Sequence, residues 1–299
     1  MPRNFQQWFP QFAPYFSPIL RDNCSAEYQA FLGEPNLWPN HRINDVVSCM
    51  LNHIDESGKA QMAAASVLLG ILPTILGMVG SNITEVGLLA LRQPILSILL
   101  SLGAPVVSPI RSFEYRSPAE MLKTKPDAVQ AFTKWQQQIY LVKYVIAVAA
   151  IGNVVHVIWQ LCVYSVCVFS GSTWWLPALW AGVSVIPHLL GAYAVRLRLR
   201  VVQRESLFAA IVGEFDFRKN QTKVKWDEFP ESIWYIVFSW MASFLTILHL
   251  VMGTVILSSA LFISPSDAVV LSIRLLSSAV ICRILLMFEL HITRHFAQL

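Results

Sequence analysis

The feature that most constrains this chain is a series of long apolar segments. Six of them cover about 62–80, 86–107, 138–169, 174–195, 233–263 and 268–290. Each is close to or above the roughly 20 residues that a helix needs to cross about 30 Å of hydrocarbon. The apolar residues do not alternate with a period of two, which favours helices over barrel strands. The sequence therefore predicts an all-α polytopic membrane helix bundle with about six transmembrane helices.

Composition supports this class of protein and excludes others. Only 13% of the 299 residues are charged, whereas soluble proteins usually carry about 25%. A net charge of +4 is too small to indicate a nucleic-acid partner. Together these values exclude a disordered chain, a soluble nucleic-acid-binding protein and a small disulfide-linked scaffold. The lipid bilayer is the first partner that the sequence predicts.

The connections between the apolar segments differ in length and charge. The tail 1–61 and the loops 108–137 and 196–232 carry four, five and eight Lys or Arg residues, whereas the short turns carry none. With six crossings these long segments and both termini lie on one side, which the positive-inside rule makes cytosolic. We therefore expect an N-terminal tail, a transmembrane domain over 62–290 with two cytosolic loops, and a C-terminal tail over 291–299. The endoplasmic reticulum is the default membrane for such a chain.

The second apolar segment is the weak point of this topology, because Arg92, Gln93 and Pro94 interrupt it. If that segment were re-entrant or interfacial, the tail would lie on the lumenal side. Cys24 and Cys49 in the tail could then form a disulfide, since disulfides persist in oxidising compartments. The tail is rich in aromatic residues and proline, which argues against a regular helix there. The remaining cysteines lie in apolar runs, and we find no Cys/His spacing typical of a metal site.

Polar residues inside membrane spans are costly and often functional. Asn153, His156 and Gln160 share one face of the third apolar segment. Such a stripe either fixes the packing of helices through hydrogen bonds or lines a pocket, and both interpretations stay open. His188 follows Pro187 in the fourth segment, where a proline frees a backbone carbonyl.

Carboxylates gather at the rims of the predicted spans, and none lies deep in one, which argues against a proton-coupled pump. Glu85 opens the second segment, and Glu114 lies between two arginines in the loop that follows. A carboxyl group at an aromatic, low-dielectric rim has a raised pKa and can act as a general acid. A solvated ion pair with a nearby arginine is the alternative for each. We expect three ionisable residues near cytosolic helix ends to snorkel and act as anchors, namely Lys143, Arg283 and Glu289.

One part of the chain resembles a known group of proteins. The stretch GSNITEVGLLALRQPILSILLSLGAP, followed by SPIRSFEYRSPAEMLK, is similar to multi-span proteins of filamentous fungi. Within that group the chain resembles the membrane-bound terpene cyclases of meroterpenoid pathways, of the ascofuranone type. The resemblance covers about residues 20–125 and the spacing of the later spans, and it carries over no catalytic residue. It implies a metal-independent isomerase or lyase without a cofactor, which agrees with the absence of phosphate-binding and aspartate-rich motifs.

The resemblance also implies a reaction. A carboxylic acid protonates an (epoxy)farnesyl-bearing aromatic or polyketide intermediate, the chain cyclises among aromatic faces, and a base ends the cascade. The substrate is a hydrophobic prenylated small molecule. We rank Glu85 and Glu114 as candidate acids, and His156 and His188 as candidate bases or orienting groups. A small-molecule transporter or channel and a non-catalytic membrane scaffold remain alternatives.

Overall fold

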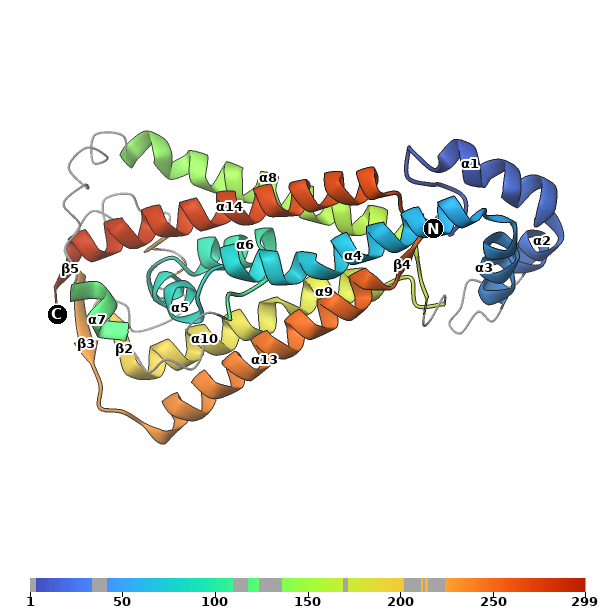
Figure 1. The fold of residues 1–299 in the computed structure, drawn as a ribbon. Helices are drawn as coiled ribbons and strands as arrows, with labels where there is room; N and C mark the ends of the chain where they lie inside the picture. The colour runs from blue at the N-terminus through green and yellow to red at the C-terminus, as the bar shows by residue number, and fades with distance from the viewer. Residues whose placement is uncertain are drawn as a thin grey trace. The chain divides into compact units, whose positions relative to one another are not determined.

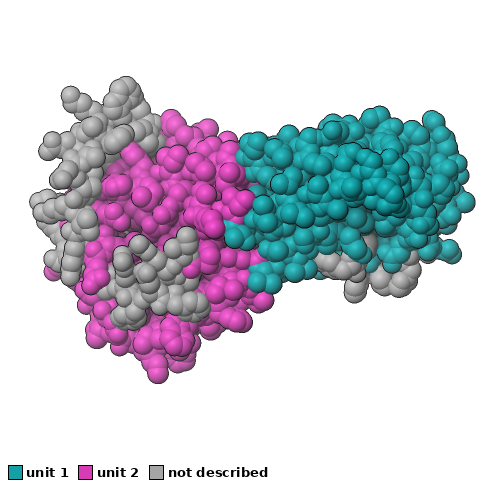
Figure 2. All heavy atoms as spheres, in the orientation of Figure 1, with its two compact units in different colours: residues 1–74, 155–181, 251–274 teal, residues 75–154, 182–250, 275–299 magenta. Residues whose placement is uncertain are grey.

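The computed structural model describes residues 4–33, 42–109, 118–123, 136–168, 172–201, 211, 213–214 and 224–298. The chain divides into two compact units (Figure 2). Unit 1 comprises Met1–Thr74, Val155–Ala181 and Val251–Arg274. Unit 2 comprises Ile75–Val154, Gly182–Leu250 and Leu275–Leu299. Each unit is described by itself below.

Helices dominate the described residues, which confirms the predicted all-α class (Figure 1). Five of them are long and apolar enough to cross a membrane, if the interrupted pair α9–α10 is taken as one span. They are α4 (Glu56–Val79), α8 (Gln136–Tyr164), α9 (Leu176–Val183) with α10 (Val185–Arg198), α13 (Ile233–Ser258) and α14 (Pro265–Phe296). These helices correspond to five of the six predicted spans, so the protein is an integral membrane protein with five candidate spans.

The predicted span over 86–107 is wrong. Its residues form two ten-residue helices, α5 (Ile83–Arg92) and α6 (Pro94–Gly103) (Figure 1). Each helix is about 15 Å long, half of a bilayer core. The break falls at Gln93, with φ −135° and ψ 77°, because Pro94 has no N–H to continue α5. The two ends of the hairpin meet where the Ser108 N–H donates to the Ser81 carbonyl at 2.9 Å.

The α5–α6 hairpin is held against α10 within unit 2. Asn82 caps α5 in a capping box, accepting from the Thr84 N–H while Glu85 accepts from the Asn82 N–H. Gly191 of α10 lies against Ile83, and a β-carbon at this glycine would overlap the isoleucine side chain. The absence of a side chain at Gly191 therefore allows the close approach of α10 to α5.

The N-terminal tail folds into short helices inside unit 1. These are α1 (Ala13–Pro18), the π-helix η1 (Ile19–Asn23), α2 (Ser25–Gly33) and α3 (Arg42–His53). A regular helix was not expected over the proline-rich part, yet α1 forms there because a proline occupies its first turn, where no N–H is needed. An aromatic core holds these helices together, with Phe5, Trp8, Phe12, Phe16, Phe31 and Phe262 all buried. A disulfide between Cys24 and Cys49 adds a covalent link.

The remaining described elements are short. In unit 1, β1 (Val166–Cys167) pairs antiparallel with β4 (Ala260–Leu261). In unit 2, β3 (Val224–Glu228) lies between β2 (Leu199–Val201) and β5 (Ala297–Gln298). A six-residue helix, α7 (Pro118–Lys123), is also part of unit 2. These pairings close turns and ends of the long helices, so the architecture stays that of a helix bundle.

Candidate functional site

The break between α5 and α6 holds polar side chains that are almost fully buried in unit 2. Lys143 of α8 donates from Nζ to Gln93 Oε1 and to Glu289 Oε1, both at 2.8 Å. Gln93 Nε2 in turn donates to Glu289 Oε2 at 2.8 Å. The three side chains thus close a ring of hydrogen bonds between the break, α8 and α14. Each of these residues is 2% exposed, so the ring is sealed from solvent.

Glu214 caps the second half of the hairpin. Its Oε2 accepts from the Ile95 N–H at 2.8 Å and its Oε1 from the Leu96 N–H at 2.9 Å. The Tyr144 hydroxyl donates to the same Oε1 at 2.8 Å. The first turn of a helix leaves N–H groups without intrahelical acceptors, and a carboxylate also matches its positive dipole end. The side chain of Gln93, the N-cap residue of α6, makes no capping hydrogen bond. The fully buried Glu214, from a distant segment, caps the helix in its place.

Arg92 completes the set, and two aromatic rings adjoin it. Arg92 Nη1 donates to Thr293 Oγ1 at 3.2 Å, and its guanidinium lies 5.8 Å from the centroid of the Phe296 ring. The Lys143 ammonium lies 5.4 Å from the centroid of the Tyr144 ring. We call Arg92, Gln93, Lys143, Glu214 and Glu289 the buried ion cluster. It holds two cations and two anions, so its formal charges balance.

The expectation that Lys143 and Glu289 snorkel to a rim as anchors is wrong. Their side chains are each 3% exposed and form an ion pair at 2.8 Å. Sequence reasoning judged each residue on its own helix, where a position near the end permits snorkelling. The partner is 146 residues away along the chain. Only the antiparallel packing of α8 and α14 makes the pair visible.

Glu85 is the third residue of α5, and its carboxylate already has two sets of partners. Besides the Asn82 N–H, it accepts from the Arg283 guanidinium, whose Nη2 donates to Oε1 at 3.1 Å and whose Nη1 donates to Oε2. The ion-pair alternative for Glu85 is thus what the structure shows, with Arg283 as the arginine. Arg283 is accordingly a partner of Glu85 and not a free anchor. Glu114 lies outside the described residues.

The two predicted histidines have different surroundings. His156, in unit 1, accepts at Nδ1 from Arg274 Nη2 at 2.8 Å and stacks on the Trp159 ring at 5.9 Å. Its Nε2 must then carry the hydrogen of the neutral ring. His188, in unit 2, is 4% exposed, and its Nδ1 donates to the Ser184 carbonyl at 2.8 Å. Its Nε2 is then the basic nitrogen, which suits a proton acceptor.

Among the described residues, Glu85, His156 and His188 do not hydrogen-bond one another. Asn153 belongs to the same polar stripe as His156 but donates from Nδ2 to Ser278 Oγ at 2.8 Å in unit 2. That bond joins α8 to α14, as the packing interpretation of the stripe requires. Because Glu114 lies outside the described residues, the grouping of the four predicted residues into one site stays a prediction. The buried ion cluster, in contrast, brings described ionisable groups of unit 2 into contact.

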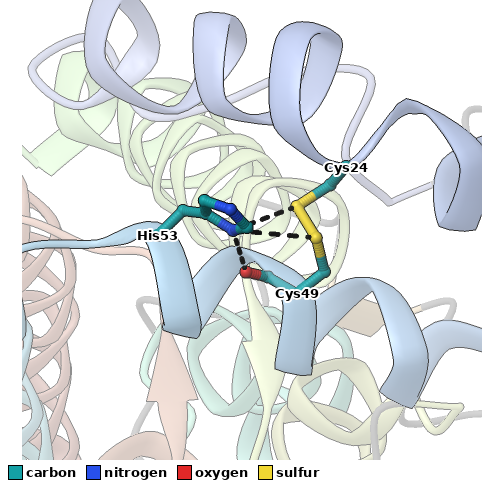
Figure 3. A group of neighbouring side chains, drawn as sticks. All are labelled: Cys24, Cys49 and His53. Carbon is teal, nitrogen blue, oxygen red and sulfur yellow. Dashed lines mark hydrogen bonds between the residues drawn. A yellow bond between two sulfur atoms is a disulfide. The ribbon is translucent and has the colours of Figure 1, made fainter.

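One described group of side chains has the geometry to hold a metal ion. The ligand atoms of Cys24, Cys49 and His53 lie within 4.8 Å of one another (Figure 3). No metal site was predicted from the spacing of Cys and His residues, although Cys49 and His53 are one helical turn apart. Both sulfurs are used in the disulfide, so no thiolate is available as a ligand in this state.

Comparison with protein-family models, with curated proteins and with solved structures found no match. The functional assignment therefore depends on the buried ion cluster and on the sequence resemblance stated above.

Proposed function

We propose that the protein is a membrane-bound terpene cyclase that starts its reaction by protonating an (epoxy)farnesyl-bearing substrate. The observation that carries this proposal is the buried Lys143–Glu289 ion pair in unit 2, with the Tyr144 ring beside Lys143 and the Phe296 ring beside Arg92 of the same cluster. Acid-initiated cyclisation needs a proton donor, a proton acceptor and π-faces that stabilise a carbocation. The buried ion cluster supplies all three next to lipid-accessible helices, where a prenylated substrate partitions.

In this proposal Glu289 and Lys143 act as a pair. Glu289 in its protonated form donates to the epoxide oxygen, and the C–O bond opens to a tertiary cation. The rings of Tyr144 and Phe296 stabilise the positive charge as the chain cyclises. Lys143 in its neutral form accepts the proton lost at the end of the cascade. The cascade thus ends with Lys143 and Glu289 as an ion pair, and proton transfer along the 2.8 Å hydrogen bond from Lys143 to Glu289 restores the neutral pair that starts the next reaction.

Glu85 and Glu114 remain candidates for the acid, and His156 and His188 for the base. Glu289 ranks ahead of Glu85 because its charged partner is the Lys143 amine, which can exchange a proton with it, whereas Glu85 pairs with the Arg283 guanidinium, which stays protonated in proteins. His188 ranks ahead of His156 because its Nε2 is free of the local carbonyl bond and can accept a proton. Each ranking is tested by one conservative substitution.

The test is conversion of an epoxyfarnesyl-phenol by microsomes from yeast that express the full chain. We expect a product of equal mass and new retention time that is absent from control microsomes. Glu289→Gln is expected to lower the rate by at least about 100-fold, the usual contribution of a general acid. Glu228→Gln is the matched control, because it changes a carboxylate that pairs with Arg198 outside the cluster and is no candidate for the acid.

Two results would contradict the proposal in different ways. No isomer from protein that is verified in the membrane would remove the cyclase assignment. Full activity of Glu289→Gln, with loss of activity in Glu114→Gln or Glu85→Gln, would leave the cyclase proposal standing. The general acid would then be Glu114 or Glu85 and not Glu289. Folding of each variant is checked by its elution as a single species in detergent, so that loss of activity is not loss of structure.

A second function is favoured by the α5–α6 hairpin itself. Broken helices whose half-helix ends meet buried charges are typical of substrate and ion sites in secondary transporters. In this chain the N-terminus of α6 is such an end, and a carboxylate, Glu214, occupies it. If the protein is a transporter, we expect flux of a small organic anion into proteoliposomes, and we expect Glu214→Gln to abolish that flux. Absence of flux, together with microsomal conversion, would remove this alternative.

We also propose that the tail lies outside the cytosol and the loops lie inside it. Five crossings place the two termini on opposite sides of the membrane. The loops 108–137 and 196–232 and Arg294 together carry fourteen Lys or Arg residues, and the tail carries four. The positive-inside rule then makes the loop side cytosolic. The disulfide supports the same assignment, because it needs an oxidising compartment around the tail.

This topology is tested with glycosylation tags fused to either end of the chain. The N-terminal tag is expected to be glycosylated in the endoplasmic reticulum and to lose mass on endoglycosidase treatment. The C-terminal tag serves as the control and is expected to stay unmodified. Unmodified tags at both ends would restore the six-crossing topology with both termini cytosolic.

A further inference from the structure

The disulfide in unit 1 has a histidine beside it. His53, on the last turn of α3, directs its ring toward the two sulfurs, and its Nδ1 lies 3.9 Å from Cys24 Sγ and 3.9 Å from Cys49 Sγ (Figure 3). The same nitrogen donates to the Cys49 carbonyl at 2.9 Å, which fixes the ring in this place. His53 is itself exposed. Solvent and small molecules therefore reach the histidine side of the disulfide.

The two sulfurs are not equivalent. Cys24 is fully buried, whereas Cys49 is partly exposed. A thiolate attacks a disulfide at a sulfur that it can reach, and the other sulfur leaves. In this protein the reachable sulfur belongs to Cys49, so Cys24 is the leaving group. The direction of any exchange reaction follows from burial alone.

The surroundings of Cys24 favour its leaving as a thiolate. Cys24 directly precedes α2, and its carbonyl accepts the first helical hydrogen bond, from the Tyr28 N–H at 3.1 Å. The residue therefore occupies the N-cap position, next to the positive end of the helix dipole. Cysteines at helix N-termini and beside a protonated histidine have lowered pKa values. The helix end thus favours a thiolate at Cys24, whereas His53 lies beside both sulfurs at 3.9 Å.

From this arrangement we propose that Cys24, Cys49 and His53 form a thiol–disulfide exchange site for a small thiol of the glutathione class. The thiolate attacks Cys49 Sγ and forms a mixed disulfide, while Cys24 Sγ leaves with the bonding electron pair. His53, with Nδ1 3.9 Å from the departing sulfur, acts as a positioning residue for that thiolate. A second thiolate attacks the incoming sulfur and releases Cys49. Two thiols are oxidised to one disulfide, and the protein pair is reduced by two electrons.

The experiment uses the full chain in detergent with reduced glutathione as the probe. The reaction is quenched with acid, free thiols are labelled with a mass-shifting maleimide, and peptides locate the glutathione adduct. We expect reduction of the folded protein, with the adduct on Cys49. We expect His53→Ala to lower the second-order rate constant about tenfold, because the departing thiolate then loses the polar ring beside it and a poorer leaving group slows exchange.

His291 offers a matched control, because its Nδ1 makes the same bond to the carbonyl four residues earlier, at 2.9 Å to Met287. His291→Ala is expected to leave the rate constant unchanged. Reduction only after addition of denaturant would overturn the proposal and leave a structural disulfide. An adduct on Cys24, or an unchanged rate constant in His53→Ala, would also overturn it. Because His53 is exposed, its substitution leaves the aromatic core of unit 1 intact.

Discussion

Two apolar segments of this chain are interrupted near a proline, and they fold differently. In the α9–α10 segment, Ser184 keeps helical angles of φ −54° and ψ −26°, and Pro187 lies in the first turn of α10. That segment remains one candidate span over Leu176–Arg198. In the α5–α6 segment, Gln93 leaves the helical region altogether and the chain turns back. A proline in an apolar run therefore does not by itself decide whether the run crosses.

The polar groups at the two breaks have different partners. At Ser184 the carbonyl accepts from the side chain of His188, one turn along the same helix. At Gln93 the side chain bonds Lys143 and Glu289, and the N–H groups after it bond Glu214. Where the polar groups at a break find hydrogen-bond partners in the same helix, the two helical halves can continue as one span. A break that depends on three other segments is held where those segments place it.

The largest effect is expected from removing one side of the buried ion pair. Glu289→Ala leaves Lys143 charged and buried, which costs about 3–5 kcal/mol of unfolding free energy. The double variant Lys143→Met with Glu289→Leu replaces both charges and is expected to recover most of that loss. Unfolding by SDS in mixed micelles measures both. A single variant as stable as the wild type would show that the cluster does not hold the hairpin.

Glu214→Ala sharpens the comparison at the α6 cap. The substitution leaves two buried N–H groups and the Tyr144 hydroxyl without their acceptor, at a cost of about 1–3 kcal/mol. Glu214→Gln, which keeps one acceptor oxygen, is expected to lose less. The same SDS titration measures this, with hydrogen exchange at Ile95 and Leu96 as the local readout. Unchanged protection of these two amides in Glu214→Ala would mean that another group caps α6.

Two glycines of the α9–α10 segment test packing around its break. Gly191→Ala places a methyl group against Ile83 and is expected to cost about 1–3 kcal/mol through overpacking. Gly182→Ala meets nothing within 4 Å and is expected to stabilise the helix by about 0.5–1 kcal/mol. Thermal unfolding in detergent compares the pair. Equal shifts would show that α10 does not press on α5.

The smallest effect concerns a local cap, that of α4. Asp55 accepts from the Gly58 N–H and the Tyr15 hydroxyl, both at 2.8 Å, and these bonds, the Gly58 bond first, lower the pKa of Asp55 from 3.8. A lowered folded-state pKa contributes stability above pH 3.8 that is lost as the pH falls through the lowered value. Asp55→Asn is expected to flatten the dependence of the melting temperature on pH between 5 and 3. A slope equal to that of the wild type would contradict this.

The class of the fold and five spans followed from the sequence because apolar length is a local property. The hairpin was foreseen only as an alternative, from Arg92, Gln93 and Pro94 in one run. The sequence alone does not decide between a full span and a hairpin over 86–107. The decision depends on the hydrogen-bond partners of Gln93, which lie 50 and 196 residues away along the chain. The closure of the Cys24–Cys49 disulfide was likewise linked to that alternative, and the two features appear together.

The candidate site was harder to predict than the fold. His188 and Glu85 stand out because each is unusual in its own segment. His188 bonds the nearby Ser184 carbonyl, whereas Glu85 bonds both the nearby Asn82 N–H and Arg283, 198 residues away. Lys143 and Glu289 were dismissed because each is ordinary in its own segment. Pairing between α8 and α14 makes them exceptional, and no single-helix pattern contains that information. Glu214, in a loop that carries several charges, gave no sign that its carboxylate caps a distant helix.

The reach of the Gln93 hydrogen bonds has a consequence for how the protein is made. Glu289 and Thr293 lie in the last helix, so the ribosome delivers them after every other part of the cluster. Until then Lys143 lacks Glu289, and Arg92 lacks Thr293, in a membrane that disfavours buried charges. The hairpin can therefore reach this arrangement only after α14 has been synthesised. A chain that ends before Glu289 is expected to leave the hairpin without the hydrogen bonds that hold it in place.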